Sequence, residues 1–352
     1  MVTNSRSAHF RNILCIVPVA ALMLLAAGCR KQASLTVVSF GGEYQNAQRT
    51  AYMVPFSQST GIKITEGEYN GEYGLLAARA TAPTPSWDVV SVESGPCMRG
   101  GEEGIFATLP DSVFGSVNLV PGAKRPYAAG HLVFSTILAF RQGQFQSGAI
   151  PDNWKDFWDL KKFPGKRGLR NNPRGTLEIA LLADGVSPDH LYPLDVQRAF
   201  RKLDEIKSQL VFWDSGAQPI QLLANKTVVM TSAYNGRLWD AWAHDHLPIG
   251  WSFNQGLMET EFWAVPKNST HKDEAFRFIA FSLDAERQAA FVNSTAYGPT
   301  NLSALPLVHA DVMSAIPSSK TILPTQVPVN PDWWAQNESR VSVLWDQWRQ
   351  GH

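Results

Sequence analysis

Short β-branched runs alternate with amphipathic stretches along the chain from residue 34 onward. The first runs predict strands at 35–40, 62–65 and 87–92, with helices at 43–59 and 73–80 between them. This alternation predicts an α/β fold with a mainly parallel sheet and helical crossovers. Because ligands of such sheets collect at the carboxyl ends of the strands, Phe40, Gly41 and Glu93 are expected near a site.

The pattern continues through the middle and the end of the chain. A further apolar strand is expected at 132–140, followed by a connection at 141–151 that contains Gly, Gln, Ser and Pro. Trp154, Phe157 and Trp158 have the helical spacing that is typical of a buried stripe. The remaining expected elements are helices at 176–183, 194–206, 271–289 and 333–348 and strands at 210–213, 227–231 and 262–266.

The chain is predicted to cross twice between two lobes. One lobe combines residues 29–140 with residues 258–352, including the C-terminal helix, and residues 141–257 form the other. A double crossing makes a hinge, and closure of a hinge around a ligand is a well-established way of binding small molecules.

The first 28 residues have the composition of an export signal. Arg6 and Arg11 are the only charged residues before the apolar run at 13–27, which is shorter than the roughly 20 residues of a spanning helix. The ending Ala26-Ala27-Gly28-Cys29 resembles the lipobox of bacterial lipoproteins, although Ala26 stands where that motif more often has Leu. The resemblance implies that residues 1–28 are removed and that Cys29 is acylated; an ordinary cleaved signal with a chance Cys is the alternative.

Charge and cysteine content narrow the class of protein. The chain has 31 Lys+Arg and 31 Asp+Glu, and no basic run that would indicate nucleic-acid binding. Of the three cysteines, Cys15 would leave with the signal and Cys29 would be acylated. Only Cys97 would then remain as a free thiol, so no intramolecular disulfide is expected.

Several motifs resemble those of solute-binding proteins of spermidine/putrescine-type ABC importers. They lie at residues 37–44, 87–90, 232–236 and 296–301, and two more, at 172–178 and 215–218, resemble a large subgroup of that family. The resemblance covers essentially the whole mature chain in the same order. It implies a two-lobed periplasmic binding protein of type II, with a mainly parallel sheet flanked by helices in each lobe and a double hinge crossing.

The resemblance also implies a function. The chain is expected to be a monomeric lipoprotein, held at the membrane by its lipid in the periplasm or at the cell surface, that captures a small cationic solute. A polyamine or a related amine is the expected solute, and permease subunits of an ABC importer in the inner membrane are the expected partners.

The pocket of this family combines aromatic walls with carboxylates that meet amine groups. Carboxylates form charge-assisted hydrogen bonds with alkylammonium groups, and aromatic faces add about 0.5–2 kcal/mol each. The positions that the resemblance carries over are Phe40, Glu178, Tyr234, Glu261, Tyr297 and Trp333. The strand-end argument adds Glu93, which could instead cap the following helix, just as Glu178 could simply favour a helix N-terminus.

Three positions depart from the family pattern. Gly175 stands where long-polyamine binders have a second acidic residue, Glu259 stands where the family usually has Trp, and Phe40 lacks the polar tip of Tyr or Trp. The ligand could therefore be shorter, singly charged, or not a polyamine. An amino-acid derivative, an opine-like compound, iron, and a role as a sensor lipoprotein stay open as alternatives.

No enzymatic motif, cofactor or metal site is predicted. The chain has no GxSxG, HExxH or P-loop pattern, and Cys97 is the one plausible nucleophile, as in thiaminase-like enzymes of the same two-lobed fold. A free Cys is commonly a small buried apolar group, so the prediction is a binding protein and not an enzyme. The pair His244 and His246 lies in a polar stretch that is typical of exposed residues rather than of metal ligands.

Overall fold

The computed structural model describes residues 1–3, 34–145 and 149–351. Cys29 and nearly all of the expected export signal lie outside these residues, so the signal and the lipid anchor stay predictions. Within the described part of the chain, no helix combines the length and the apolar character needed to cross a bilayer.

One mixed sheet runs through residues 34–351, with the order β2-β1-β3-β9-β5-β8-β6-β7 along its main path. Its strands are β1 (Ser34–Ser39), β2 (Lys63–Glu68), β3 (Val89–Glu93), β4 (Lys124–Arg125), β5 (Ala128–Arg141), β6 (Arg167–Arg170), β7 (Leu210–Trp213), β8 (Met230–Tyr234), β9 (Ile249–Ala264), β10 (Gly298–Pro299) and β11 (Val327–Pro328). The three strands β1–β3 are parallel at one end, and β6–β8 are parallel at the other.

Helices flank the sheet. The α-helices are α1 (Gly42–Gln48), α2 (Val54–Thr60), α3 (Tyr73–Thr81), α4 (Ser94–Glu102), α5 (Trp154–Trp158), α6 (Pro173–Ala183), α7 (Val196–Asp204), α8 (Gln218–Ala224), α9 (Asn235–Ala243), α10 (Lys272–Ser282), α11 (Ala285–Thr295), α12 (Ala310–Met313) and α13 (Pro331–Gln350). A π-helical stretch, η2 (Arg49–Met53), joins α1 to α2, and short 3₁₀ turns are η3 (Asp111–Val113), η4 (Pro188–His190), η5 (Lys207–Gln209), η6 (Leu302–Leu307) and η7 (Leu323–Thr325).

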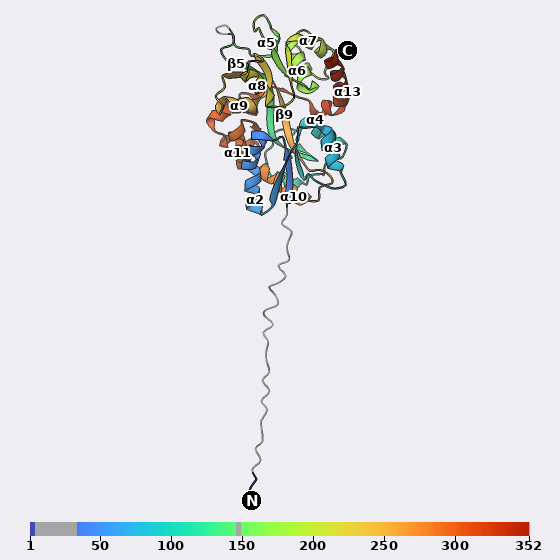
Figure 1. The fold of residues 1–352 in the computed structure, drawn as a ribbon, viewed down its shortest axis with the longest axis vertical. Coiled ribbons are helices and arrows are strands. Elements are labelled where there is room, and N and C mark those ends of the chain that lie inside the picture. The colour runs from blue at the N-terminus through green and yellow to red at the C-terminus, as the bar shows by residue number, and fades with distance from the viewer. Residues whose placement is uncertain (4–33, 146–148, 352) are drawn as a thin grey trace. The chain divides into compact units, whose positions relative to one another are not determined.

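The long strands β5 and β9 connect the two parallel groups. They pair with each other in antiparallel fashion, and they also pair with β8 and β3 respectively, so both strands belong to both lobes. Their register shifts between Thr136 and Leu138, and a bulge of this kind bends a strand. Figure 1 shows the two strands running between α2 and α10 at one end and α6 and α7 at the other. The expected α/β, two-lobed fold class is confirmed.

One expected helix is divided in two, and another is found with a π-helical stretch inside it. The helix expected at 271–289 is two helices, α10 and α11, because Asp284 begins a new helix by accepting hydrogen bonds from the backbone N–H groups of Glu286 and Arg287. The helix expected at 43–59 is a continuous run of α1, η2 and α2. Gly41 and Gly42 precede it with φ of +69° and +60°, a conformation that glycine adopts without strain.

The C-terminal helix α13 packs against α4 of the first lobe and against α6 of the second. Its buried side chains Trp334, Trp345 and Trp348 belong to the same apolar cluster as Leu169 and Leu177 from β6 and α6. Figure 1 shows α13 beside α6 and α7. The lobe limits drawn from the sequence, which grouped this helix with the first lobe, stay a prediction.

Candidate ligand-binding site

A cavity of about 280 Å³ lies between the two lobes. It is lined where strands of both lobes end: Phe40 and Gly41 follow β1, Glu93 ends β3, and Arg170 and Tyr234 end β6 and β8. The carboxyl ends of parallel strands are the usual place for ligands in such sheets. The volume lies near the lower end of the roughly 300–1,000 Å³ typical of ligand pockets, which suits a small ligand.

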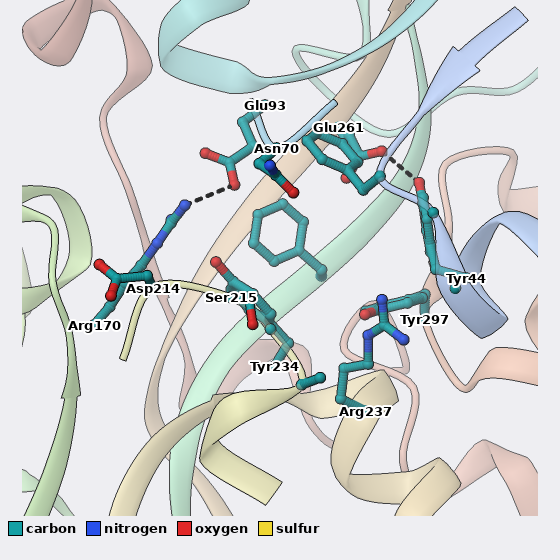
Figure 2. A pocket seen from close by; sticks show the side chains of 16 residues that line it. Tyr44, Asn70, Glu93, Arg170, Asp214, Ser215, Tyr234, Arg237, Glu261 and Tyr297 are labelled. Atoms are coloured by element: carbon teal, nitrogen blue, oxygen red, sulfur yellow. Dashed lines mark hydrogen bonds and ion pairs between the residues drawn. The ribbon is translucent and has the colours of Figure 1, made fainter. Parts of the chain in front are cut away.

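Glu261, near the C-terminal end of β9, brings a buried carboxylate to this cavity (Figure 2). Only 6% of the residue is exposed. The hydroxyl groups of Tyr44 and Ser91 donate hydrogen bonds to Oε1, and Nε2 of His131 lies 3.4 Å from the same oxygen. Burial and the Glu261 carboxylate both raise the pKa of Tyr44, so its hydroxyl stays protonated and donates.

The positive charge that would balance Glu261 is missing from its surroundings. His131 is its sole ion-pair candidate among the described residues, and burial lowers the pKa of that ring even though Glu261 opposes the shift. His131 is therefore neutral near pH 7. An ionised carboxylate without a cation is costly to bury, so Glu261 is suited to a positive guest.

Arg237, in the first turn of α9, is the complementary unpaired charge. Among the residues that the structure describes, it has no hydrogen bond and no ion pair, although it lines the same cavity as Glu261. Figure 2 shows its guanidinium beside Tyr297, on the side of the pocket away from Arg170. A guanidinium is suited to a carboxylate, which it can bind through two parallel hydrogen bonds.

Aromatic rings form much of the remaining wall. Phe40 stacks on Tyr69 with ring centroids 5.3 Å apart, and Tyr297 packs edge-on against Tyr44 at 5.7 Å. Tyr234 is half-buried and lies 5.8 Å below the guanidinium of Arg170. Phe40, Tyr234 and Tyr297 line the same cavity as Glu261 and Arg237.

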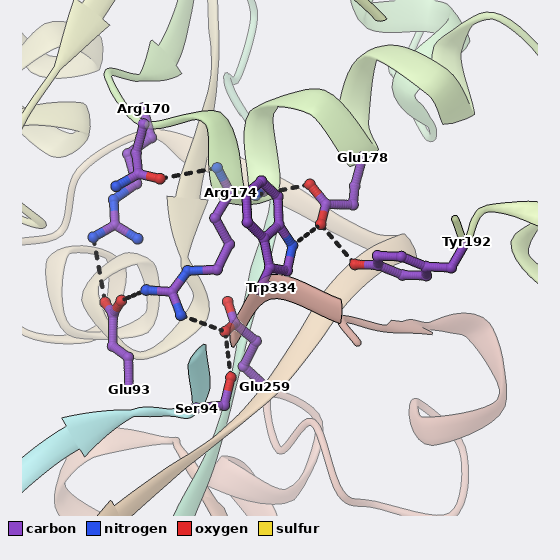
Figure 3. A network of polar contacts seen from close by, with 10 residues as sticks. Glu93, Ser94, Arg170, Arg174, Glu178, Tyr192, Glu259 and Trp334 are labelled. Atoms are coloured by element: carbon purple, nitrogen blue, oxygen red, sulfur yellow. Dashed lines mark hydrogen bonds and ion pairs between the residues drawn. The ribbon is translucent and has the colours of Figure 1, made fainter. Parts of the chain in front are cut away.

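Glu93, another charged residue of the pocket, is already paired (Figure 3). Its carboxylate accepts a hydrogen bond from Arg174 and lies 3.3 Å from Nη2 of Arg170. The other guanidinium nitrogen of Arg174, Nη1, lies 3.8 Å from Glu259, which in turn accepts a 2.8 Å hydrogen bond from Ser94. We call these five residues the Glu93 network.

The two carboxylates of this network differ in their pKa. Burial acts to raise the pKa of Glu93, but Arg170 and Arg174 outweigh it and hold that pKa below its ordinary value. Burial raises the pKa of Glu259, which Arg174 only partly offsets. Glu93 is thus the carboxylate that neutralises the arginines, and it has little charge left for a ligand amine.

Glu178 and Trp333 do not line this cavity. Glu178 is fully buried, and its carboxylate accepts hydrogen bonds from Tyr192 and Trp334, both of 2.6 Å, and from the backbone N–H of Gly175 at 2.9 Å. Figure 3 shows these contacts joining α6 to α13. Trp333 packs on Tyr192 with ring centroids 5.7 Å apart. The pocket therefore gathers the other five expected residues, Phe40, Glu93, Tyr234, Glu261 and Tyr297.

Sequence reasoning missed both arginines of the pocket. Arg170 ends β6, a strand that was not expected because Arg167-Gly168-Leu169-Arg170 has no β-branched residue. The helix of Arg237 was not expected either, since Asn235-Gly236 is typical of a turn. The rule that ligands meet the carboxyl ends of strands would have found Arg170 once its strand was recognised.

Cys97, His244 and His246 do not line this cavity. Cys97 is fully buried in α4, and burial raises the pKa of its thiol, which works against a nucleophilic role. His244 is exposed and pairs with Asp240 at 2.7 Å. No cluster of three or more metal-binding side chains is found in residues 34–145 and 149–351.

Comparison with known proteins assigns the fold and the family. The model of the bacterial extracellular solute-binding protein family matches residues 51–317. The chain belongs to this family. Among its relatives, the γ-aminobutyric acid-binding protein of Pseudomonas aeruginosa is 37% identical over 351 residues, covering 97% of this chain and 99% of the relative. The spermidine/putrescine-binding periplasmic protein of Escherichia coli is 20% identical over 315 residues, covering 86% and 88%.

Solved structures of similar proteins support the same family assignment. An ABC transporter substrate-binding protein from Bradyrhizobium japonicum is 36% identical, with a TM-score of 0.84 over 90% of this chain and 99% of that chain. The Atu4243-GABA receptor is 34% identical, with a TM-score of 0.83 over 91% and 98%. The chain is therefore an extracytoplasmic solute-binding protein of an ABC importer, with the type II two-lobed fold, a small-molecule ligand and permease subunits as partners.

Proposed function

We propose that this protein captures a short zwitterionic amino acid, with an ammonium group and a carboxylate at opposite ends of a methylene chain, and delivers it to its importer. The observation that supports this most strongly is the pair of unmatched charges, the buried Glu261 and the free Arg237, in one small cavity. Glu261 would bind the ammonium group and Arg237 the carboxylate, each by charge-assisted hydrogen bonds.

The other wall residues would complete the site. Phe40, Tyr234 and Tyr297 would cover the methylene chain, and cation–π contact with the ammonium group adds about 0.5–2 kcal/mol. Glu93 would act indirectly, by holding Arg170 at the rim of the pocket.

A polyamine fits these charges less well than a zwitterion. A polyamine offers no carboxylate to Arg237, and its second ammonium group would approach the guanidiniums of Arg170 and Arg237. Two other carboxylates line the cavity. Glu93 is paired with Arg170 and Arg174, and Asp214 accepts a 2.9 Å hydrogen bond from the side chain of Asn171. The relatives support the same choice: the protein named as a γ-aminobutyric acid-binding protein shares 37% identity with this chain, against 20% for the spermidine/putrescine-binding one.

A thermal-shift and calorimetry panel tests the proposal on the chain from residue 30 onward. Ligands would be γ-aminobutyrate, putrescine and spermidine. A ligand at 100 times its Kd stabilises a protein by about 2.7 kcal/mol, so γ-aminobutyrate should raise Tm clearly and the polyamines should not. Stabilisation by putrescine but not by γ-aminobutyrate would overturn the proposal.

We also propose that Cys29 is acylated and anchors the receptor to the membrane. The support is the apolar run at 13–27 and the small residues before Cys29. Cys29→Ser should move the full-length protein from the detergent fraction to the aqueous fraction in phase partitioning. An unchanged distribution would remove the anchor from the account.

A further inference from the structure

A second cavity, of about 320 Å³, borders the ligand pocket. The two cavities share Tyr44, Arg237 and Tyr297 as lining residues, so these three side chains form the partition between them. The second cavity is also lined by two carboxylates, those of Glu43 and Asp240, and Asp240 lies 2.7 Å from Nδ1 of His244, which lines the same cavity. These carboxylates are opposite in charge to the guanidinium of Arg237.

Two members of the partition are fixed in place. Tyr44 and Tyr297 are 6% and 7% exposed, and they pack against each other and against Phe291. Tyr44 also donates a hydrogen bond to Glu261. Moving either ring would break several of these contacts at once.

Arg237 is held by fewer contacts than the two tyrosines. It is half-buried and, within the described part of the chain, has neither a hydrogen bond nor an ion pair. Its guanidinium passes between two glycines: a Cβ on Gly42 would lie 3.6 Å from Nη1, and a Cβ on Gly216 would lie 3.9 Å from Nε. The space beside it is therefore left open by residues that have no side chain.

The geometry points to Arg237 as the residue that sets both the length and the charge of the ligand. This inference rests on the proposed function, since it assigns to Arg237 the ligand's carboxylate. With Arg237 present, the pocket ends at a positive charge and takes a short zwitterion. With the side chain removed, the two cavities join, and the extended pocket runs from the carboxylate of Glu261 toward those of Asp240 and Glu43. A longer dication suits such a pocket.

Two variants of Arg237 separate its role as a barrier between the cavities from the role of its positive charge. Arg237→Ala removes both, whereas Arg237→Met removes the charge and keeps most of the volume. Both should bind γ-aminobutyrate on the order of 30-fold more weakly or worse, as expected for truncating one member of a buried charge pair. Only Arg237→Ala should gain binding of pentane-1,5-diamine or hexane-1,6-diamine, by roughly tenfold or more over the wild type. Adding Asp240→Asn to Arg237→Ala should reduce that gain.

Calorimetry with γ-aminobutyrate and the two diamines measures each effect, and thermal melts show that each variant is folded. Arg237→Ser replaces Arg237→Ala should the latter not fold. The inference is overturned if the truncated variant gains no diamine affinity, or if Arg237→Met gains as much. A wild type that does not bind γ-aminobutyrate would instead contradict the proposed function, and the diamine gain would still report on the partition.

Discussion

The Glu93 network and the pair formed by Glu261 and Arg237 are two charged groups at the same junction between lobes, and they differ in what balances them. In the network, each charge lies next to an opposite charge of the chain, and both arginines meet Glu93. In the pocket, Glu261 has only neutral partners, and Arg237 has no polar partner among the described residues. Burial alone therefore does not identify a ligand-binding charge.

The difference between the two groups separates structural charges from ligand-binding charges. A structural charge has a partner within the protein, and a ligand-binding charge lacks one. A buried charge that is already paired is costly to disturb but has little affinity left for a guest. A buried charge without a partner lowers the stability of the empty protein, and a guest of the opposite sign restores it. The predictions that follow alter members of these two groups and, for comparison, Glu178, a hydrogen-bonded carboxylate outside both.

The largest effect is expected for Glu93→Gln. The amide cannot neutralise Arg170 and Arg174, so two guanidiniums would face each other with one remaining carboxylate, Glu259. Loss of one member of a buried ion pair costs about 3–5 kcal/mol. The free energy of unfolding, measured in urea, should fall by that amount.

Glu259→Gln is the matched control for this loss. Because burial raises the pKa of Glu259, its ionised form is disfavoured in the folded protein, and an amide should change the free energy of unfolding by about 1 kcal/mol or less. Equal losses of unfolding free energy in the two variants would show that Glu93 contributes no more to stability than Glu259.

Glu261→Gln should weaken ligand binding without lowering the free energy of unfolding, in contrast to the loss of stability expected for Glu93→Gln. It removes the charge that meets the ligand's ammonium group, and the binding free energy should weaken by about 2–5 kcal/mol. The empty protein should keep its free energy of unfolding or gain slightly, because an unbalanced buried carboxylate is gone. Calorimetry with γ-aminobutyrate and urea unfolding measure the two effects; undiminished affinity would exclude Glu261 from the site.

Glu178→Gln should lower stability without changing affinity. Three donors converge on this carboxylate, from Tyr192, Trp334 and the backbone of Gly175, and an amide nitrogen would face one of them. An unsatisfied buried donor costs about 1–3 kcal/mol. Urea unfolding should show this loss, and a tenfold or larger drop in ligand affinity would contradict the assignment of Glu178 to the α6–α13 contact.

The smallest effect is a pH dependence of the Glu93 contribution. The pKa of Glu93 is lowered in the folded protein, so its stabilising contribution is complete above the ordinary pKa of Glu, about 4.3, and is lost as the pH falls through the folded value. The difference in unfolding free energy between the wild type and Glu93→Gln should therefore shrink in acid. A difference that stays constant or grows would contradict the pairing with Arg170 and Arg174.

Much of the fold follows from local patterns in the sequence. Strands β1, β3 and β7 have β-branched or aromatic runs, and the helices α3 and α7 have clear amphipathic spacing, so these elements lie where the pattern predicts them. The break between α10 and α11 was missed because the capping side chain of Asp284 competes with an otherwise unbroken helical pattern.

The site was predictable only in part. Glu93 and Phe40 follow from their places at strand ends, and the family resemblance named Tyr234, Glu261 and Tyr297. Whether a carboxylate is paired depends on residues far away in the sequence, since Glu93 meets Arg174 across 81 positions and Glu178 meets Trp334 across 156. Only tertiary packing decides such pairs, so the sequence could not separate Glu261 from Glu178.

The most direct test of the central claim is calorimetry of the wild-type protein with γ-aminobutyrate, butylamine and butyrate. The three compounds share one carbon chain, and each analogue lacks one of the two charged groups. If Glu261 and Arg237 each bind one end of the ligand, both analogues should bind on the order of 30-fold more weakly than γ-aminobutyrate, or worse. Butylamine binding as tightly as γ-aminobutyrate would contradict the account, because the carboxylate would then contribute nothing.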